Sequence, residues 1–480
     1  MAGRLPLLAA LAAGALGLLA APAGAATIRV DVTNDELNDD GDCALREAVQ
    51  SANENKAISG CAKGQTSSDK IVLKGSQYTI TGAVSEDDNE AGDFDVVAAG
   101  SLIIEGKGPG ETTVFQSGDD RVFELFTAAK LTMEDLRVSG GDVTSHDSPD
   151  DDGGNFLVKG SKLTLDNVDV TSGDASSGGA IFADQAGARV RISRGLLDSN
   201  DALTVGGTIS LRTGTKATIS RSTLQLSEVT SAAQNAAGGI IHNAGDGLKV
   251  FDSALQGSSA DTAGAGNAAF GAAIYSSAPL VIKRSVLRGN TASAATDNTA
   301  ENGGALYLNG DTTLIVNSTF FDNRAGGPGD NDGQGGAIFS SSVEVDVKHS
   351  TFDSNDASAE GDVFRALGGT LTVFGSIFDD GTDPCSGDSV VSSGFNVSES
   401  IDANCNFAGS DIVGGDPGLG VFADNGGPTE TIAIQPTSDA KNLVSLKKCK
   451  QATGLEDQRG FTRPKGKKCD AGAFELGANP

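Results

Sequence analysis

The chain of 480 residues repeats short apolar runs with a period close to 32 residues. One unit has the form Gly-Gly-x-aliphatic-aromatic with small variations, and it begins at Gly178, Gly206, Gly238, Gly271, Gly303 and Gly335. A second unit accompanies it and is centred on a small residue, at Gly195, Ser222, Ser253, Ser285, Ser318, Ser350 and Ser376. A fixed period of this length is typical of solenoids, whose coils contact only their neighbours.

The apolar runs are too short for helices, and they alternate with polar residues as strands do. We therefore expect a β-solenoid of about ten coils, in which equivalent residues stack about 4.8 Å apart. Glycine supplies the positive φ that the corners need. Asparagines recur at another corner, where we expect them to be left-handed, at Asn200, Asn290, Asn323 and Asn355.

The two ends of a solenoid expose apolar surface and strand edges, so both ends need a cover. Leu45, Ala48, Val49 and Ala52 have helical spacing, which predicts a short capping helix with Asp42 as its N-cap. After residue 380 the repeat is lost. We therefore divide the chain into an N-terminal cap at 26–100, β-helix repeats at 101–380 and a C-terminal cap at 381–480.

Residues 1–25 have the pattern of a secretory signal peptide. A positive charge at Arg4 precedes the apolar stretch Leu5–Ala21, and Ala23-Gly24-Ala25 supplies an A-x-A cleavage site. We expect a secreted or cell-surface protein. No later window approaches the ~18 consecutive apolar residues of a membrane span.

Six cysteines lie near the ends of the chain. In an oxidising compartment the simplest of the possible pairings is three local disulfides, Cys43–Cys61, Cys385–Cys405 and Cys449–Cys469. Zinc binding is the alternative, but the chain has no C-x₂₋₄-C pair.

Composition and charge narrow the function further. Glycine accounts for 65 residues and tryptophan for none, which fits a core of stacked small aliphatic side chains. The net charge of −29 makes nucleic acids and anionic membranes unsuitable partners, because their binding depends on lysine and arginine. We expect a monomer whose partner is an extracellular polysaccharide or a surface protein.

Several motifs resemble families of exported bacterial proteins. Cys43-Ala44-Leu45-Arg46-Glu47-Ala48 resembles the CSLREA domain, and Cys469-Asp470-Ala471-Gly472-Ala473-Phe474-Glu475 is similar to the end of the choice-of-anchor Q domain. The units at Gly178 and Gly335 resemble polymorphic outer membrane protein repeats. The resemblance implies an all-β, single-stranded right-handed parallel β-helix, a pectin-lyase-like solenoid with disulfide-stapled ends, and it implies no particular reaction.

Proteins of this shape include lyases of acidic polysaccharides, which use arginine or lysine as a base and often calcium. Arg194, Arg221 and Arg284 occupy one column just before the corner serines, and they are the candidates for such a catalytic base. The alternative is a solvated face that offsets nearby aspartates. The carboxylate set of an inverting polygalacturonase-like hydrolase is not present as a set.

The aromatic position of the first unit gives a candidate ligand-binding column: Phe182, His242, Tyr275, Tyr307 and Phe339, with Ser210 as its non-aromatic member. If the preceding aliphatic residues face inward, these side chains face outward and could stack on sugars or a partner. Alternatively, a corner interrupts the alternation and both sets are packed.

One segment has an EF-hand-like order of oxygen ligands. Glu36, Asn38, Asp40, Asp42 and Glu47 fall on positions 1, 3, 5, 7 and 12 of such a loop, which makes Ca²⁺ the one cofactor to consider. The alternative is a solvated acidic entry to the cap.

Taken together, the sequence predicts a secreted or cell-surface β-helix with a binding, adhesive or structural role. The alternative is a pectate-lyase-like polysaccharide lyase.

Overall fold

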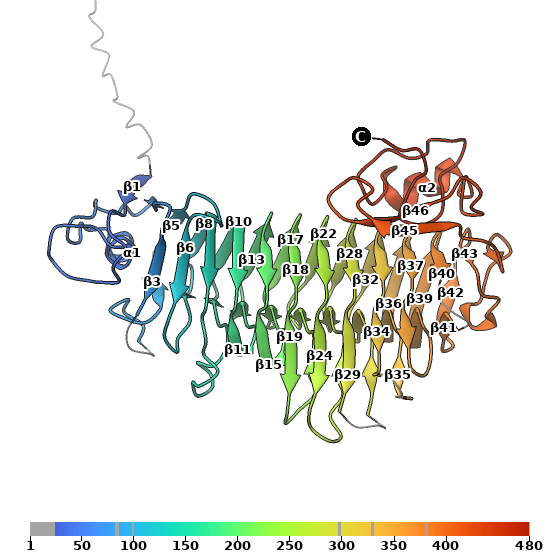
Figure 1. The fold of residues 1–480 in the computed structure, drawn as a ribbon, viewed down its shortest axis with the longest axis horizontal. Coiled ribbons are helices and arrows are strands. Elements are labelled where there is room, and N and C mark those ends of the chain that lie inside the picture. Colours follow the sequence, from blue (N-terminus) through green and yellow to red (C-terminus); the bar gives the residue numbers. More distant parts are fainter. Residues whose placement is uncertain are drawn as a thin grey trace, which may run out of the picture.

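The computed structural model describes residues 25–479, apart from 82–85, 98–99, 296–298, 328–330 and 380–382. The expected signal peptide therefore lies almost wholly outside the described residues. Parallel strands stack along one long axis, with α1 (Leu45–Glu54) at one end and the last elements of the chain at the other (Figure 1). This arrangement confirms the predicted parallel β-helix. None of the helices within these limits is long and apolar enough to cross a membrane.

Each complete coil contributes to four rows of strands. The first row carries the Gly-Gly units and contains β4 (Phe94–Val96), β7 (Phe123–Leu125), β9 (Phe156–Lys159), β12 (Ile181–Asp184), β16 (Ile209–Leu211), β21 (Ile241–Asn243), β26 (Ile274–Ser276), β31 (Leu306–Leu308) and β41 (Cys385–Ser386). The second row contains β1 (Ala26–Arg29), β2 (Ser68–Val72), β5 (Ser101–Glu105), β13 (Arg189–Ser193), β17 (Lys216–Ser220), β22 (Leu248–Phe251), β27 (Leu280–Lys283), β32 (Thr313–Val316) and β42 (Val390–Ser392). Two long strands, β36 (Ile338–Lys348) and β39 (Phe364–Phe374), run through both rows.

The third row contains β3 (Gln77–Ile80), β6 (Thr113–Gln116), β14 (Leu196–Asp198), β18 (Thr223–Gln225), β23 (Ala254–Gln256), β28 (Val286–Arg288), β33 (Thr319–Phe321), β37 (Thr351–Asp353), β40 (Ile377–Asp379), β43 (Val397–Ser398) and β44 (Ile412–Val413). The long strands β8 (Lys130–Ser139) and β10 (Lys162–Thr171) run through the second and third rows. The fourth row is a separate sheet of β11 (Asp174–Ser177), β15 (Asp201–Val205), β19 (Glu228–Ser231), β24 (Ser259–Thr262), β29 (Thr291–Ala294), β34 (Arg324–Ala325) and β38 (Asp356–Ala357). The same sheet continues from β15 through short strands, namely β20 (Ala236–Ala237), β25 (Ala269–Phe270), β30 (Glu301–Asn302) and β35 (Gly333–Gln334).

The interior consists of the apolar columns that the repeat predicted. Ile192, Ile219 and Val250 are in register on consecutive coils and are fully buried. Phe320 and Phe352 continue a neighbouring column, with ring centroids 4.9 Å apart. The leading glycines of the first unit have φ between 59° and 74°, and a side chain at Gly178 would lie 2.4 Å from the Ile181 carbonyl oxygen.

The corner asparagines differ from the expectation. Asn200, Asn290, Asn323 and Asn355 do not have positive φ; the residue before each of them does, namely Ser199, Gly289, Asp322 and Ser354. The asparagine side chains instead point inward and form a buried ladder. Asn290 Nδ2 donates to Asn323 Oδ1 at 2.9 Å, and Asn323 Nδ2 donates to Asn355 Oδ1 at 2.9 Å. They therefore satisfy polar backbone inside the coil rather than turning the chain.

Helix α1 covers the first coils, as predicted, and its apolar face is buried. The expectation of Asp42 as N-cap was wrong, because the helix begins at Leu45 and Ala44 is the N-cap. The Glu47 carboxylate accepts the Ala44 N–H at 3.0 Å and performs the capping. Buried Arg46 forms an ion pair with Asp35 at 2.7 Å and donates to the Gly92 and Asp93 carbonyls.

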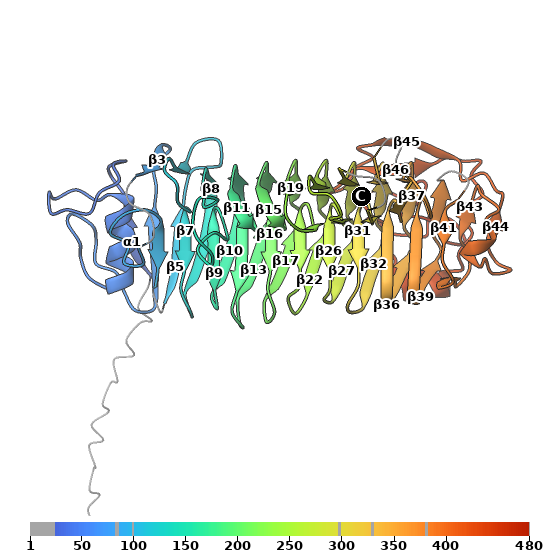
Figure 2. The ribbon, with the colours of Figure 1, turned by 90° about the horizontal axis from the view of Figure 1, so that it is seen from below.

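The C-terminal part of the chain covers more than the end of the solenoid. Residues 385–413 close the last coils, including a 3₁₀ turn at Ala403–Cys405. Residues 415–479, which we call the flank segment, fold back along the side of the preceding coils (Figures 1 and 2). The flank segment contains the hairpin of β45 (Leu419–Ala423) and β46 (Thr431–Ile434) and helix α2 (Leu446–Thr453). All three disulfides are the predicted local pairs.

Candidate ligand-binding site

The aromatic column of the first row faces outward, away from the aliphatic core. The residues that precede it, such as Ile241 and Ile274, are fully buried. His242, Tyr275 and Tyr307 are half-buried, whereas Phe182 and Phe339 at the two ends of the column are buried. Neighbouring rings are stacked, with centroids 4.9 Å apart for His242–Tyr275, 5.3 Å for Tyr275–Tyr307 and 5.1 Å for Tyr307–Phe339. Both sequence interpretations therefore hold in part. The rings point outward, but they cover one another's faces.

The ring column is interrupted at Ser210. This residue is in register with Phe182 on one side and with His242 on the other. One face of Phe182 and one face of His242 are consequently turned toward a position that carries only a hydroxymethyl group. The Arg212 guanidinium enters this gap and lies 5.2 Å from the Phe182 ring centroid.

A hollow of about 320 Å³ lies beside His242, next to the interruption; Ser210 itself is fully buried and does not line it. Asp151 and Asp152 line it from the loop before β9, and Arg212 and His242 line it from the first row. Hydroxyl groups complete the lining, from Ser148, Ser176, Ser177 and Thr204. We call this the ring-gap hollow. It combines carboxyl, guanidinium and hydroxyl groups with the half-buried imidazole of His242, which is the one ring in its lining.

Burial shifts the pKa values of two side chains in the ring-gap hollow. It raises the pKa of Asp152 to about 6, against the opposing effects of hydrogen bonding to Ser177 and of the Arg212 charge. The nearest Asp152 and Arg212 atoms are 4.0 Å apart. Burial, followed by the charge of Arg212, lowers the pKa of His242 to about 4, so its imidazole is neutral at pH 7. The buried His242 Nδ1 has no hydrogen-bond partner within the described part of the chain.

Two groups of this hollow were missed by sequence reasoning. Asp152 belongs to an Asp-rich insertion outside the repeat units, and Arg212 follows the repeat unit without a motif of its own. The one usable signal was Ser210, the non-aromatic member of an otherwise nearly aromatic column. A break in a column marks the place where stacked neighbours are separated.

The arginine column lies elsewhere, at the corner between the second and third rows. Arg194, Arg221 and Arg284 have φ of 57°, 50° and 51°. Arg194 pairs with Asp166 at 2.6 Å, and Arg284 pairs with Asp252 at 2.6 Å and with Glu456 at 2.9 Å. Arg221 has no ion pair among the residues described. This geometry favours the interpretation of the column as a face that offsets nearby carboxylates.

The predicted calcium ligands are only partly brought together. Oxygen atoms of Glu36, Asp40 and Asp42 lie within 4.8 Å of one another. Burial, followed by the nearby Asp40 carboxylate, raises the pKa of Asp42 to about 6. Glu47 accepts the Asn38 and Ala44 N–H groups, so its carboxylate is engaged at the helix start. Three carboxylates are suitable ligands for a hard cation such as Ca²⁺. Calcium binding at this cluster stays a prediction.

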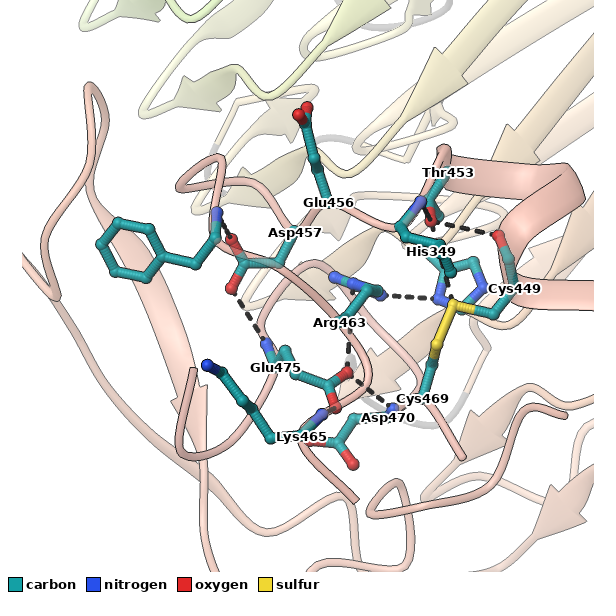
Figure 3. A network of polar contacts seen from close by, with 12 residues as sticks. His349, Cys449, Thr453, Glu456, Asp457, Arg463, Lys465, Cys469, Asp470 and Glu475 are labelled. Carbon is teal, nitrogen blue, oxygen red and sulfur yellow. Dashed lines mark hydrogen bonds and ion pairs between the residues drawn. A yellow bond between two sulfur atoms is a disulfide. The ribbon is translucent and has the colours of Figure 1, made fainter. Parts of the chain in front are cut away.

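Of the other two histidines, His349 joins the flank segment to the coils (Figure 3). Arg463 donates to His349 Nδ1 at 2.8 Å and to the carbonyls of Gly472 and Ala473, and it lies 3.9 Å from Glu475. Both Arg463 and His349 are fully buried. His146 contacts the Asp119 carbonyl at 2.9 Å. Only His242 therefore belongs to the ring-gap hollow.

The comparisons with known proteins add no assignment, because no family model and no curated protein matches the chain.

Proposed function

We propose that this protein is an exported bacterial β-helix protein of the secreted or cell-surface class, and that it binds a glycan in the ring-gap hollow. The interruption of the ring column at Ser210 carries the proposal. Next to the interruption, His242 lines a hollow together with Arg212, Asp152 and several hydroxyl groups. A sugar needs an apolar face to stack on and polar partners around its edge, and the hollow offers both.

The charged groups favour an acidic sugar. A guanidinium is suited to bind a carboxylate, and Arg212 reaches into the hollow. Asp152 opposes such a ligand when it is ionised. Because its pKa is about 6, protonation on going from pH 7.5 to 5 removes that repulsion and releases Arg212. We therefore expect an acidic glycan to bind more tightly at pH 5.

Isothermal titration of the purified protein with pectate, alginate, a glycosaminoglycan and neutral dextran tests the proposal. Ser210→Phe completes the ring column and fills the gap, so it is expected to weaken binding roughly tenfold or more. Arg212→Gln should weaken the binding of acidic glycans only. Ser210→Ala leaves the gap open and is the matched control. Circular dichroism establishes that each variant is folded.

A glycan that binds wild-type protein and Ser210→Phe equally would place the ligand outside the ring-gap hollow. Binding that is unaffected by Arg212→Gln would remove the role of the guanidinium.

The second candidate function, a polysaccharide lyase, is supported by the presence in the hollow of an arginine, the residue type that can serve as the base. Ultraviolet absorbance of the unsaturated product, followed in the same mixtures, distinguishes the two. Steady product formation that disappears in Arg212→Gln makes the protein a lyase. If product formation is instead lost only in Arg221→Ala, the catalytic base belongs to the arginine column and not to the ring-gap hollow. Binding without product supports the binding role.

A further inference from the structure

Four cations follow one another along the outer side of the second row. Their positions are in register on consecutive coils, and we call them the cation column: Lys130, Lys162, Arg189 and Lys216. The three lysines are exposed, while the next residue of each strand, such as Leu163, is buried in the core. Arg191 and Lys249 lie beside the column, along a groove of about 440 Å³.

Four carboxylates follow one another along the outer side of the fourth row, and we call them the carboxylate column: Asp142, Asp174, Asp201 and Glu228. The residues that follow the last three, Ala175, Ala202 and Val229, point inward and are buried. Leu203 protrudes beside this column with half of its surface exposed (50%).

The two columns match in number, step and position along the axis. Each carboxylate follows the cation of its own coil by twelve residues. Both columns advance by one strand spacing per coil, about 4.8 Å. The two views place the row β10–β13–β17 and the row β11–β15–β19 on opposite sides of the long axis (Figures 1 and 2). One side of these coils therefore carries the cation column, with Asp246 as the one carboxylate in the lining of its groove, and the opposite side carries the carboxylate column.

Neither column is neutralised within the chain. None of the eight side chains has an ion pair among the described residues. Like charges stacked in register on adjacent strands repel one another. Burial, followed by the neighbouring Asp201 and Asp142 carboxylates, raises the pKa of Asp174 to about 6. Each column thus costs stability in a single molecule, which a partner of opposite charge would relieve.

We propose that the cation column binds the carboxylate column of a second copy of this chain, so that molecules associate side by side with their long axes aligned. Acidic polysaccharide would also satisfy the cations, but it would leave the carboxylate column unexplained. A second copy satisfies both columns at once with an identical step. Leu203 beside the carboxylate column is placed to enter the groove beside the cation column.

Such an interface is heterologous, since each molecule offers a different surface to each neighbour. It therefore continues into open rows instead of closing into a dimer. Each exposed charge pair contributes little, on the order of 0.2–1 kcal/mol, so association should be weak and sensitive to salt. This inference goes beyond the proposed glycan binding, which uses other residues, and it replaces the monomer expected from the sequence.

Sedimentation velocity of the purified protein at about 20 mM and about 0.5 M NaCl tests the inference. We expect the mean mass to rise with protein concentration at low salt and to return to that of the monomer at high salt. Lys162→Glu/Lys216→Glu and Asp174→Lys/Glu228→Lys should each weaken association roughly tenfold or more. In a mixture of the two variants, the acidified cation column of one can bind the basic carboxylate column of the other. Mixing should therefore restore association.

Lys63→Glu/Lys107→Glu makes the same change of charge on exposed lysines elsewhere and is the matched control. Leu203→Ser tests the interface without changing charge, should a charge variant fail to fold. Ser210→Phe should associate like the wild type, which separates this inference from the glycan proposal.

A monomer at all concentrations and low salt would overturn the inference. The inference would also be overturned if the protein stays monomeric and pectate binds the wild type but not Lys162→Glu/Lys216→Glu. That result would assign the cation column to acidic polysaccharide.

Discussion

At the scale of single residues, the coils depend on polar side chains that are buried and fully engaged. Asn323 shows this best. Its amide oxygen accepts from the backbone N–H of Asn290 at 3.3 Å and from the Asn290 side chain at 2.9 Å. Its amide nitrogen donates to Asn355 and to the Leu287 carbonyl. A residue so placed stabilises two neighbouring coils at once.

Asn323→Ala should destabilise the protein by about 1–3 kcal/mol, because it leaves buried donors of Asn290 without an acceptor. Asn34→Ala, at an exposed asparagine, should change the free energy of unfolding by less than about 0.5 kcal/mol. Equilibrium unfolding in guanidinium chloride measures both. Equal effects of the two substitutions would contradict the role of the ladder.

His349 makes stability depend on pH. Burial, followed by the charge of Arg463, lowers its pKa well below the ordinary value of a histidine. The unfolded chain therefore binds a proton that the folded chain does not. The contribution of neutral His349 is complete above about pH 6.5 and is lost as the pH falls below it.

In His349→Gln the amide oxygen still accepts from Arg463, but nothing titrates there. We expect the loss of stability between roughly pH 7.5 and 5 to be about 2 kcal/mol smaller than in the wild type. Unfolding curves at the two pH values measure it, with His146→Gln as the control. An unchanged pH dependence in His349→Gln would show that His349 does not contribute.

At the scale of elements, helix α1 is fixed to the first coils by more than apolar packing. The guanidinium of Arg46 forms an ion pair with Asp35, donates to two carbonyls before β4, and lies 4.8 Å from the Phe94 ring centroid. Its side chain is almost completely buried. Removing it leaves those carbonyls without this donor and Asp35 without its ion-pair partner, with the Thr81 N–H still donating to Asp35.

Arg46→Ala is therefore expected to destabilise the protein by about 3–5 kcal/mol, the cost of breaking a buried charge pair. Lys56→Ala removes an exposed ion pair with Glu54 and should cost at most about 1 kcal/mol. Thermal unfolding, together with limited proteolysis of the N-terminal cap, measures the difference. A similar cost for both variants would mean that α1 does not depend on Arg46.

At the scale of the whole molecule, periodicity made the coils predictable. Every coil adds the same residue types to the same columns, so the sequence indicates which side chains meet even across hundreds of residues. The apolar columns follow from this period, whereas the capping helix follows from its helical spacing and the disulfides from the simplest local pairing of the six cysteines. The asparagine ladder was placed at the correct corner with the wrong conformation, because an inward amide and a left-handed turn share one sequence pattern.

Contacts outside the periodic columns could not be predicted in this way. The flank segment meets the coils through single contacts, such as Arg463 with His349 and Glu456 with Arg284. Likewise, Asp152 reaches Arg212 because of the path of one loop. Neither arrangement repeats from coil to coil, so the periodic pattern of the sequence does not predict it. The ring-gap hollow was therefore visible only as a break at Ser210.

The position of the flank segment determines how the molecule would respond to force. A pull transmitted through residues 415–479 does not act first on the last coil. It acts in shear on several strands together, through contacts such as Gln458 with Thr319 and Ala473 with Thr351. Contacts sheared in parallel share the load, whereas coils peeled from an end break one at a time. The fold thus protects its last coils from unwinding when it is held under tension at that end.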